Sequence, residues 1–339
     1  MKEALLQQYQ KSIAPSEALI RDMARLKGDI MILGAGGKMG PALAKLAVRA
    51  VSAAGTKSRV MAASRFSEPR LECELQTAGI VTYPVDLLDD RQLFDLPEVE
   101  NVLFLAGMKF GTTGNEPLTW AMNTYLPGRV AEKYRNATIV AFSTGNVYPF
   151  TPVVSGGAME ATLPEPVGEY AQSCLGRERI FQYSSRKYGT KVLLYRLNYA
   201  IDVRYGVLLE IARTVLERRP LDLSMGYVNV IWQGDANEIA LRCLHHGASP
   251  AKILNVTGPE TLSVRTLAEG FGQLLGREPV LAWAEEPTAL LSNAAECVNL
   301  FGLPRVNTQE MMELISRWLL EGGDTIRKPT HFQERGGRF

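Results

Sequence analysis

The sequence predicts an α/β protein, a doubly wound parallel sheet with a smaller C-terminal α/β lobe. Short apolar segments typical of buried strands alternate with segments of helical spacing over residues 29–198, and such alternation builds a parallel sheet covered on both faces. A glycine-rich turn follows the first strand, and the alternation loosens after residue 198. We expect one large domain over 29–198 and mainly a second lobe over 199–327, with some segments returning to the first.

The segment 1–28 is predicted to be an N-terminal docking helix. Its apolar residues follow helical spacing, at Leu19, Ile20, Met23 and Leu26. Ser16 can cap the start of this helix, and Gly28 can end it. The first residues are charged and lack the apolar run of a signal peptide, and no apolar stretch approaches the roughly 20 residues that span a bilayer. A cytoplasmic location is therefore expected.

Six apolar segments are expected to form the strands of the large domain, at residues 29–37, 58–65, 79–89, 99–107, 136–145 and 190–198. Helices are predicted between most of them, for example over 41–55 and 120–134. The lobe is expected to hold a strand over 251–258 and helices over 204–220, 234–247, 262–276 and 308–323. The tail, 328–339, is polar and contains glycine, and it is either disordered or draped over a partner or a cleft.

Composition excludes several classes of protein. Lys plus Arg number 37 against 36 for Asp plus Glu, so no basic surface for nucleic acid or an acidic membrane is expected. Four cysteines lie far apart without C-x-x-C spacing and are predicted to be reduced thiols. Only three histidines are present, which argues against a histidine-rich metal site.

The segment "GAGGKMG" lies between the first predicted strand and its helix. It places glycines at Gly34, Gly36, Gly37 and Gly40. Here backbone can approach a pyrophosphate closely, and the helix N-terminus supplies N–H groups and positive dipole. The alternative is a glycine-rich turn without a ligand. In its strand–turn–helix context the motif favours a dinucleotide site in a Rossmann-type domain.

The end of the second strand indicates which dinucleotide would bind. An acidic residue there would bind ribose hydroxyls, but this chain has Ser64 and Arg65. A hydroxyl and a guanidinium suit a 2′-phosphate, and Lys38 could add charge. NADP is therefore predicted, with NAD possible, unless Arg65 is only a solvated surface residue. Asp86 is expected near the adenine, or else it caps the following turn.

Together these motifs carry a family resemblance. "GAGGKMG", "AFSTGNVYP", Tyr170, "LLYRLN" and "NVTGPETLSVRTLAE" resemble the extended short-chain dehydrogenases/reductases, the NAD-dependent epimerase/dehydratase proteins, over roughly residues 28–320. The resemblance implies that Thr144, with Ser143 beside it, polarises the reacting carbonyl or hydroxyl. It implies Tyr170 as general acid/base and a structural role for Asp235. The full predicted cofactor set is Gly34, Gly36, Gly37, Lys38, Met39, Gly40, Ser64, Arg65, Asp86, Leu87, Ala106, Gly107, Asn123 and Cys174.

A physical argument supports Thr144 and Tyr170 independently of the resemblance. A hydroxyl and a phenol could converge on one carbonyl oxygen at the carboxyl edge of the sheet, where such folds place ligands. Taken singly, Thr144 could be a hydroxyl that ends a strand, and Tyr170 a half-buried aromatic at a helix start. Their occurrence together, in this order, favours a catalytic pair.

Position 174 departs from the family pattern, which is Tyr-x-x-x-Lys on one helical face. Here the lysine is replaced by Cys174, a neutral thiol that cannot lower the pKa of Tyr170. Arg177 is the nearest cation of the predicted helix, and only its long side chain could reach back. Cys174 itself is expected to be a packing residue rather than a nucleophile, because no histidine lies nearby in sequence to activate it.

The predicted function is an NAD(P)-dependent oxidoreductase or epimerase that acts on a sugar, sugar acid, polyol or nucleotide sugar. A dehydratase is disfavoured, because the Asp-Glu pair of such enzymes is replaced by Gly145 and Asn146. The alternative is a catalytically silent NADP-binding sensor or regulatory protein. A small carbohydrate-like partner is expected, and a homodimer is left open. Residues predicted to line a substrate cleft are Lys109, Asn198, Tyr199, Arg204 and Trp232.

Overall fold

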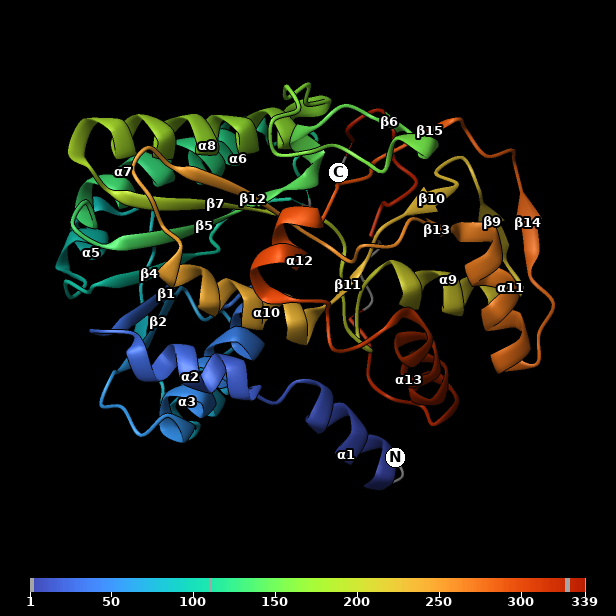
Figure 1. Cartoon of the computed structure of the whole chain (residues 1–339), viewed down its shortest axis with the longest axis horizontal. Coiled ribbons are helices and arrows are strands. Elements are labelled where there is room, and N and C mark those ends of the chain that lie inside the picture. Colours follow the sequence, from blue (N-terminus) through green and yellow to red (C-terminus); the bar gives the residue numbers. More distant parts are fainter. Residues whose placement is uncertain (1–2, 110, 327–329, 339) are drawn as a thin grey trace.

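The computed structural model describes residues 3–109, 111–326 and 330–338. Its main feature is a seven-stranded sheet in the order β12-β7-β5-β4-β1-β2-β3, and every neighbouring pair is parallel (Figure 1). The strands are β1 (Ile30–Leu33), β2 (Val60–Ser64), β3 (Val81–Pro84), β4 (Asn101–Phe104), β5 (Thr138–Thr144), β7 (Lys191–Leu197) and β12 (Lys252–Val256). This confirms the predicted doubly wound α/β fold.

Helices cover both faces of this sheet. The alternation along β1 shows why, because Ile30 and Ile32 lie in one apolar core while Met31 and Leu33 lie in the other. The first face is covered by α2 (Glu17–Arg25), α3 (Gly40–Ala53), α4 (Pro69–Thr77), α10 (Gln233–Arg242) and α12 (Ala295–Phe301). The second is covered by α5 (Asp90–Asp95), α7 (Leu126–Lys133) and α8 (Gly168–Tyr188). The helices that connect successive strands therefore pack on the faces of the sheet.

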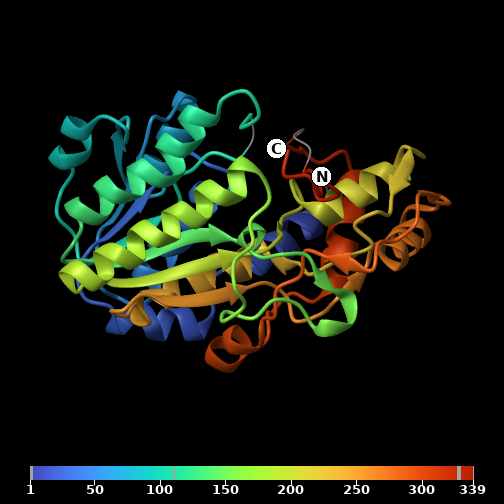
Figure 2. The same ribbon diagram turned by 90° about the horizontal axis from the view of Figure 1, so that it is seen from above.

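A second core gathers most of the chain after β7, and we call this body the C-terminal lobe. Its helices are α9 (Val207–Leu216), α11 (Val264–Leu275) and α13 (Thr308–Leu320). Four two-stranded pairs complete it: β8 (Ala200–Ile201) with β11 (Ile231–Trp232), β9 (Pro220–Asp222) with β14 (Val280–Ala282), β10 (Tyr227–Val228) with β13 (Leu262–Ser263), and β6 (Thr151–Pro152) with β15 (Thr288–Ala289). Figure 2 shows the strand arrows of the large sheet pointing toward this lobe.

The N-terminal segment forms two helices where one docking helix was expected. Ser16 caps α2 as predicted, accepting a hydrogen bond from the backbone N–H of Leu19. The preceding helix, α1 (Glu3–Ser12), instead packs on the C-terminal lobe through buried Leu5 and Tyr9. The Tyr9 hydroxyl donates to Asp202 at 2.8 Å. The two helices therefore cover different cores, joined by a turn at residues 13–16.

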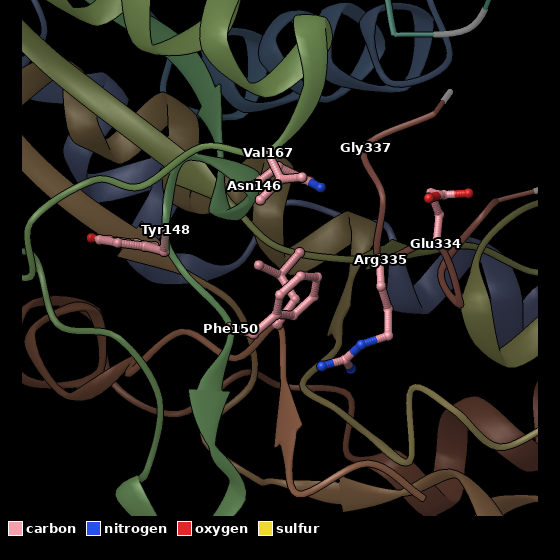
Figure 3. Close-up of a pocket in the computed structure, with 8 residues that line it drawn as sticks. Asn146, Tyr148, Phe150, Val167, Glu334, Arg335 and Gly337 are labelled. Atoms are coloured by element: carbon pink, nitrogen blue, oxygen red, sulfur yellow. The ribbon is translucent and has the colours of Figure 1, made fainter. Parts of the chain in front are cut away.

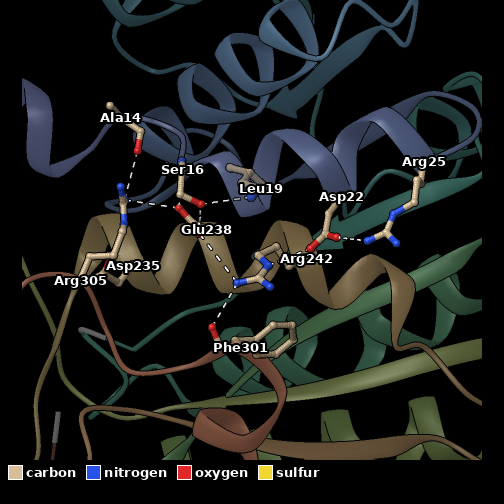
Figure 4. A network of polar contacts seen from close by, with 10 residues as sticks. All are labelled: Ala14, Ser16, Leu19, Asp22, Arg25, Asp235, Glu238, Arg242, Phe301 and Arg305. Carbon is tan, nitrogen blue, oxygen red and sulfur yellow. Dashed lines mark hydrogen bonds and ion pairs between the residues drawn. The ribbon is translucent and has the colours of Figure 1, made fainter.

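Polar contacts fix this turn and α2 onto α10 (Figure 4). The hydroxyl of Ser16 donates to Glu238 at 2.5 Å, and Arg242 donates to Asp22 at 2.8 Å. Asp235, for which the resemblance implies a structural role, accepts hydrogen bonds from Arg305 and from the backbone N–H of Val306. The start of the chain is thus tied to α10 and to the segment that leads into α13.

The described part of the tail, residues 330–338, packs against the body of the protein. Phe332 is buried in the core of the C-terminal lobe. Arg335 donates to the carbonyl and hydroxyl oxygens of Thr288 at 2.9 and 2.6 Å. Gly337 lies against the backbone of Gly168, the first residue of α8. The described part of the tail is thus packed against the C-terminal lobe and the start of α8 rather than extended into solvent. Residues 328, 329 and 339 of the predicted tail lie outside the described part. No helix in the described ranges is long and apolar enough to cross a membrane.

Candidate active site

The glycine turn joins β1 to α3 at the point where the strand order reverses. Gly34 has a φ of +89°, and a Cβ there would lie 2.5 Å from the backbone nitrogen of Ala106 after β4. A Cβ on Gly40 would overlap the Ala35 carbonyl, so only glycine lets α3 start this close to the strand. Gly36 and Gly37 are exposed. The turn therefore leaves backbone open at a helix N-terminus, as the pyrophosphate of a dinucleotide requires.

The ends of β2 and β3 lie beside this turn. A Cβ on Gly36 would be 2.6 Å from the Ser64 hydroxyl oxygen, and Arg65 is exposed next to it. Asp86 caps its own turn by accepting a hydrogen bond from the Leu88 N–H at 3.0 Å, which is the second role predicted for it. Leu87 is buried under the sheet edge.

Lys38 and Met39, both in the predicted turn, contact parts of the molecule outside it. The ammonium of Lys38 lies 3.4 Å from the centroid of the Tyr205 ring, in the C-terminal lobe. Met39 precedes α3 and packs partly against the core on that face of the sheet. Lys38 thus contacts both the turn and the lobe at the base of the predicted cofactor site.

Asn123 supports the loop after β4. It lies in a π-helical turn, η1 (Ala121–Tyr125), between α6 (Glu116–Trp120) and α7, so the helix predicted over 120–134 contains one wide turn. Its side chain bonds both backbone groups of Met108 at 2.8 Å and also donates to Ser173. Such π-turns often occur at functional sites. The buried amide fixes the path of Gly107, Met108 and Lys109.

Arg177 lies beneath the same loop. Its guanidinium donates to the Asn123 side-chain oxygen at 2.8 Å and to the Phe142 carbonyl oxygen at 2.6 Å. It is 5 % exposed, and a Cβ on Gly107 would overlap it. This buried guanidinium is near enough to Tyr170 to lower the pKa of its phenol.

Thr144 and Ser143 end β5 and point in different directions, as successive residues of a strand do. The Thr144 hydroxyl donates to the side chain of Asn146 at 2.9 Å, in η2 (Gly145–Val147). Ser143 donates at 2.5 Å to Glu178, a buried carboxylate that also pairs with Arg196 at 2.6 Å. Ser143 is thus engaged in a buried network between the sheet and α8, while Thr144 remains on the side of Tyr170.

Tyr170 lies in the first turn of α8, half-buried, and packs against the apolar cluster that contains Cys174, with the Thr144 hydroxyl near enough to affect its pKa. Burial raises the pKa of Tyr170 above its usual value, and nearby Cys174 raises it further. The Arg177 charge and the Thr144 hydrogen bond act in the opposite direction. Burial also raises the pKa of the Cys174 thiol, which is 1 % exposed and packs with Val147 and Tyr148. Cys174 is thus a neutral packing residue.

Lys109 comes to the same place from the loop after β4. Its ammonium lies 5.6 Å from the centroid of the Tyr170 ring. Burial lowers the pKa of Lys109 to about 8, and the nearby Cys174 partly opposes that shift. Phenol, thiol, hydroxyl and amine, from three separate segments, therefore form one cluster at the carboxyl end of β5.

A pocket opens beside this cluster, between η2, the start of α8 and the tail (Figure 3). It holds about 260 Å³ of empty space, including open solvent at its mouth. Figure 3 shows the Arg335 guanidinium directed toward the Phe150 ring, and its carbon lies 4.3 Å from the ring centroid. The lining residues are Asn146, Tyr148, Phe150, Val167, Leu290, Glu334, Arg335 and Gly337.

The remaining residues predicted for the substrate cleft have other contacts in the structure. Trp232 is completely buried in the C-terminal lobe, its ring 6.3 Å from that of Tyr9. Arg204 is exposed and pairs with Asp202, which binds Tyr9. Tyr199 packs partly against the same core. These three residues belong to the lobe and its contact with α1, so a packing role accounts for their positions.

Asn198 lies behind the pocket wall. Its amide donates to the carbonyl of Leu290, which lines the pocket, and to Asn229. None of the residues that line the pocket was assigned to the site from the sequence, including the polar ones, Asn146, Tyr148, Glu334 and Arg335.

Comparison with known proteins identifies the fold. The chain matches no family model, and no curated protein is found similar to it.

Solved structures do match. They include the UDP-glucose 4-epimerase of Thermus thermophilus in complex with NAD (20% identity, TM-score 0.69, 87% of this chain and 99% of that chain). The UDP-glucuronic acid 4-epimerase of Bacillus cereus in complex with NAD is 16% identical (TM-score 0.71, 86% and 99%). The dTDP-glucose 4,6-dehydratase DesIV of Streptomyces venezuelae, with NAD bound, is 17% identical (TM-score 0.71, 87% and 97%). The chain thus has the fold of sugar-nucleotide epimerases and a dehydratase that bind NAD.

Proposed function

We propose that the protein is an NAD(P)-dependent oxidoreductase or epimerase that acts on a hydroxyl or carbonyl of a sugar, sugar acid, polyol or nucleotide sugar. The observation that carries the proposal is the meeting of Thr144 and Tyr170 beside a pocket at the carboxyl edge of the sheet. The glycine turn at the same edge fits a dinucleotide. The ligands of similar structures support the same class of chemistry: NAD in the epimerases named above, and UDP-glucose in the UDP-glucose 4-epimerase of Thermotoga maritima.

The bound nicotinamide would accept or donate a hydride. Thr144 would donate a hydrogen bond from Oγ1 to the reacting oxygen and hold it in place. The phenol oxygen of Tyr170 would take the proton of a substrate hydroxyl, or return a proton to a carbonyl oxygen. The backbone N–H of Asn146, which donates to Thr144 Oγ1 at 3.2 Å, would hold that oxygen in place while the hydroxyl proton turns from the Asn146 side-chain oxygen to the reacting oxygen.

For the cofactor we propose a dinucleotide carrying a 2′-phosphate, bound by Ser64 and Arg65. The exposed guanidinium and the half-buried hydroxyl flank the glycine turn, while Asp86 is engaged in its own turn. NAD remains the alternative, since the similar structures were crystallised with it. The phosphate contacts of arginine are charge-assisted and bidentate, which favours NADP.

The test replaces Tyr170 with Phe. Removing one hydroxyl from an acid/base residue should reduce turnover by about 10²–10⁴-fold, while NAD(P) affinity and melting temperature stay near the native values. Substrates are found first by thermal shift, as a second stabilisation by sugars and sugar acids in the presence of cofactor. Tyr183→Phe, at the exposed far end of α8, is the matched control. Full turnover in Tyr170→Phe would refute the assignment.

The silent-sensor alternative is favoured by a specific observation, the neutral, buried Cys174 in place of a lysine. A sensor would be stabilised by the dinucleotide and by no second small molecule. The same thermal-shift series therefore distinguishes the two functions, because an enzyme should show a further shift with its substrate.

A further inference from the structure

Residues 334–337 of the tail form one wall of the pocket beside Thr144 and Tyr170. Figure 3 shows this segment facing Asn146 and Phe150 across the pocket. The space is about 260 Å³ even with the open solvent at its mouth, which is below the roughly 300–1,000 Å³ of pockets that enclose a drug-sized ligand. A free monosaccharide matches a pocket of this size, whereas a nucleotide sugar also carries a base, a ribose and a diphosphate.

This wall is held in place on both sides. Before it, the backbone N–H and the hydroxyl of Thr330 both donate to Glu210, and Phe332 is buried in the core of the C-terminal lobe. After it, Gly337 packs directly on Gly168; both have a positive φ, and a Cβ on either would overlap the backbone of the other. A ligand that extends past the wall must therefore displace these contacts.

Arg335 brings a positive charge to the wall. Its Nη1 and Nη2 donate to the carbonyl and hydroxyl oxygens of Thr288, and Nη1 also lies 3.7 Å from the sulfur of Met225. These bonds use the end of the guanidinium, and the Phe150 ring lies against it. Its side edge, Nε–H with the remaining N–H of Nη2, finds no acceptor in the described ranges of the chain. Two parallel N–H groups of this kind bind a carboxylate or a phosphate in a bidentate manner.

The neighbouring carboxylate does not neutralise this charge. Glu334 accepts a hydrogen bond from the backbone N–H of Gly336, and Figure 3 shows its carboxylate pointing away from the Arg335 guanidinium. The polar partners of Arg335 in the described residues, Thr288 and Met225, are uncharged. A half-buried cation without a counter-ion favours the binding of an anion beside it.

We propose that the site takes a free monosaccharide that carries an oxyanion, a carboxylate or a phosphate, and that the side edge of Arg335 binds this group. Thr144 and Tyr170 then act on a hydroxyl or carbonyl elsewhere on the same sugar. Arg335 is a specificity-determining residue supplied by the tail, and the wall excludes nucleotide sugars. This inference rests on the proposed function, because it names the substrate class of the same site.

The experiment is a calorimetric titration of the full-length protein saturated with its dinucleotide. Glucuronate and galacturonate are compared with glucose and galactose, which lack the carboxylate, and with UDP-glucuronate, which adds the nucleotide. Glucose 6-phosphate shows which oxyanion is preferred. At least one anionic monosaccharide should bind about tenfold or more tighter than its neutral counterpart and than UDP-glucuronate. Equal binding of neutral and anionic sugars, equal or tighter binding of UDP-glucuronate, or no binding of any anionic monosaccharide overturns the inference.

Substitutions at Arg335 test the contact itself. Arg335→Gln should weaken binding of the anionic sugar by about 10–100-fold, the loss of one charge-assisted contact, and leave the neutral sugar unaffected. Arg335→Lys keeps the charge but lacks the bidentate edge, so it should restore only part of the affinity. Arg338→Gln, at an exposed arginine of the same tail, is the matched control. Native affinity for the anionic sugar in a folded Arg335 variant, checked by melting temperature, contradicts the proposal.

Cofactor absorbance separates this inference from the proposed function. Selective binding of an anionic monosaccharide without hydride transfer refutes the proposed function but supports the binding site. Hydride transfer with UDP-glucuronate that is lost in Tyr170→Phe, without preference for a free anionic sugar, supports the proposed function and overturns the inference.

Discussion

The glycine turn and the Tyr170 cluster lie at the same edge of the sheet but are built in different ways. The glycines of the turn are contiguous in sequence; the constraint on Gly40 comes from Ala35 within the turn, and that on Gly34 from Ala106 after the neighbouring strand β4. The cluster brings Lys109, Thr144 and Tyr170 together from three loops or helix starts. The turn is thus specified mainly by one segment and the strand beside it, whereas an acid/base centre depends on side chains from several elements.

This difference implies different responses to mutation. In the turn, a substitution should act through steric overlap, and its effect should depend on the space at each glycine. In the cluster, a substitution should act through charge and hydrogen bonding, and its effect should pass from one element to another. The following predictions test that distinction, from the largest expected effect to the smallest.

Gly40→Val should have the largest effect. A Cβ at Gly40 would overlap the backbone of Ala35, lying 2.4 Å from its carbonyl oxygen. We expect a loss of about 3 kcal/mol or more in the free energy of unfolding, together with loss of dinucleotide binding, because overpacked sites typically lose 1–3 kcal/mol and occasionally more. Urea unfolding and calorimetric titration measure both.

Gly37→Ala is the control within the same turn, since its Cβ would approach other atoms only at 3.4 Å. It should fold normally. If Gly40→Val and Gly37→Ala are equally stable, the steric account of the turn is wrong.

Arg177→Met should have an intermediate effect on the free energy of unfolding, and it should also loosen the loop after β4. The variant removes a buried cation and leaves the Asn123 side chain and the Phe142 carbonyl without this donor. Hydrogen bonds to charged groups contribute about 1.5–3 kcal/mol, so a loss of about 2 kcal/mol in the free energy of unfolding is expected. Faster amide hydrogen exchange at Met108, detected by mass spectrometry, would show that the loop after β4 is released. Native exchange there would contradict the proposed support.

Arg65→Ala should have the smallest effect, limited to cofactor choice. Arg65 is exposed and has no structural role in the described contacts, so stability should be unchanged. Affinity for NADP should fall by about tenfold, corresponding to one charge-assisted contact, with NAD binding unaffected. Arg186→Ala, an exposed arginine at the far end of α8, serves as control. Equal binding of NAD and NADP by the native protein would exclude the 2′-phosphate site.

The sequence predicted the fold more completely than the site. All seven strands of the sheet fall within predicted segments, because alternation of apolar runs and helical spacing is local information. The seventh, β12, was expected in the C-terminal lobe but pairs with β7 in the large sheet, a placement that spacing along the chain does not determine. Contacts between residues far apart in the sequence could not be predicted in the same way. Trp232 and Ser143 are typical residues for a cleft, but the first is buried against Tyr9 and the second is bound to Glu178. Neither contact follows from spacing along the chain.

The place of Lys109 illustrates the same limit. The sequence indicated that Tyr170 lacked a lysine one turn further along its helix, and it placed Lys109 only near a substrate. The Lys109 ammonium lies 5.6 Å from the Tyr170 ring centroid, and the residue before it, Met108, is held by Asn123 of a π-turn that no pattern in the sequence predicts.

The position of α1 has a consequence for biosynthesis. Its buried residues, Leu5 and Tyr9, pack on the C-terminal lobe, and Tyr9 bonds Asp202, which lies 193 residues later in the chain. At a synthesis rate of about 5–20 residues per second, that partner emerges roughly 10–40 s after the helix itself. During this interval the apolar face of α1 has nothing in the nascent chain to cover it, while α2 needs residues up to α10 for its own contacts. Helix α1 is therefore synthesised well before the lobe on which it docks, and its docking must wait until much of the large sheet has been made.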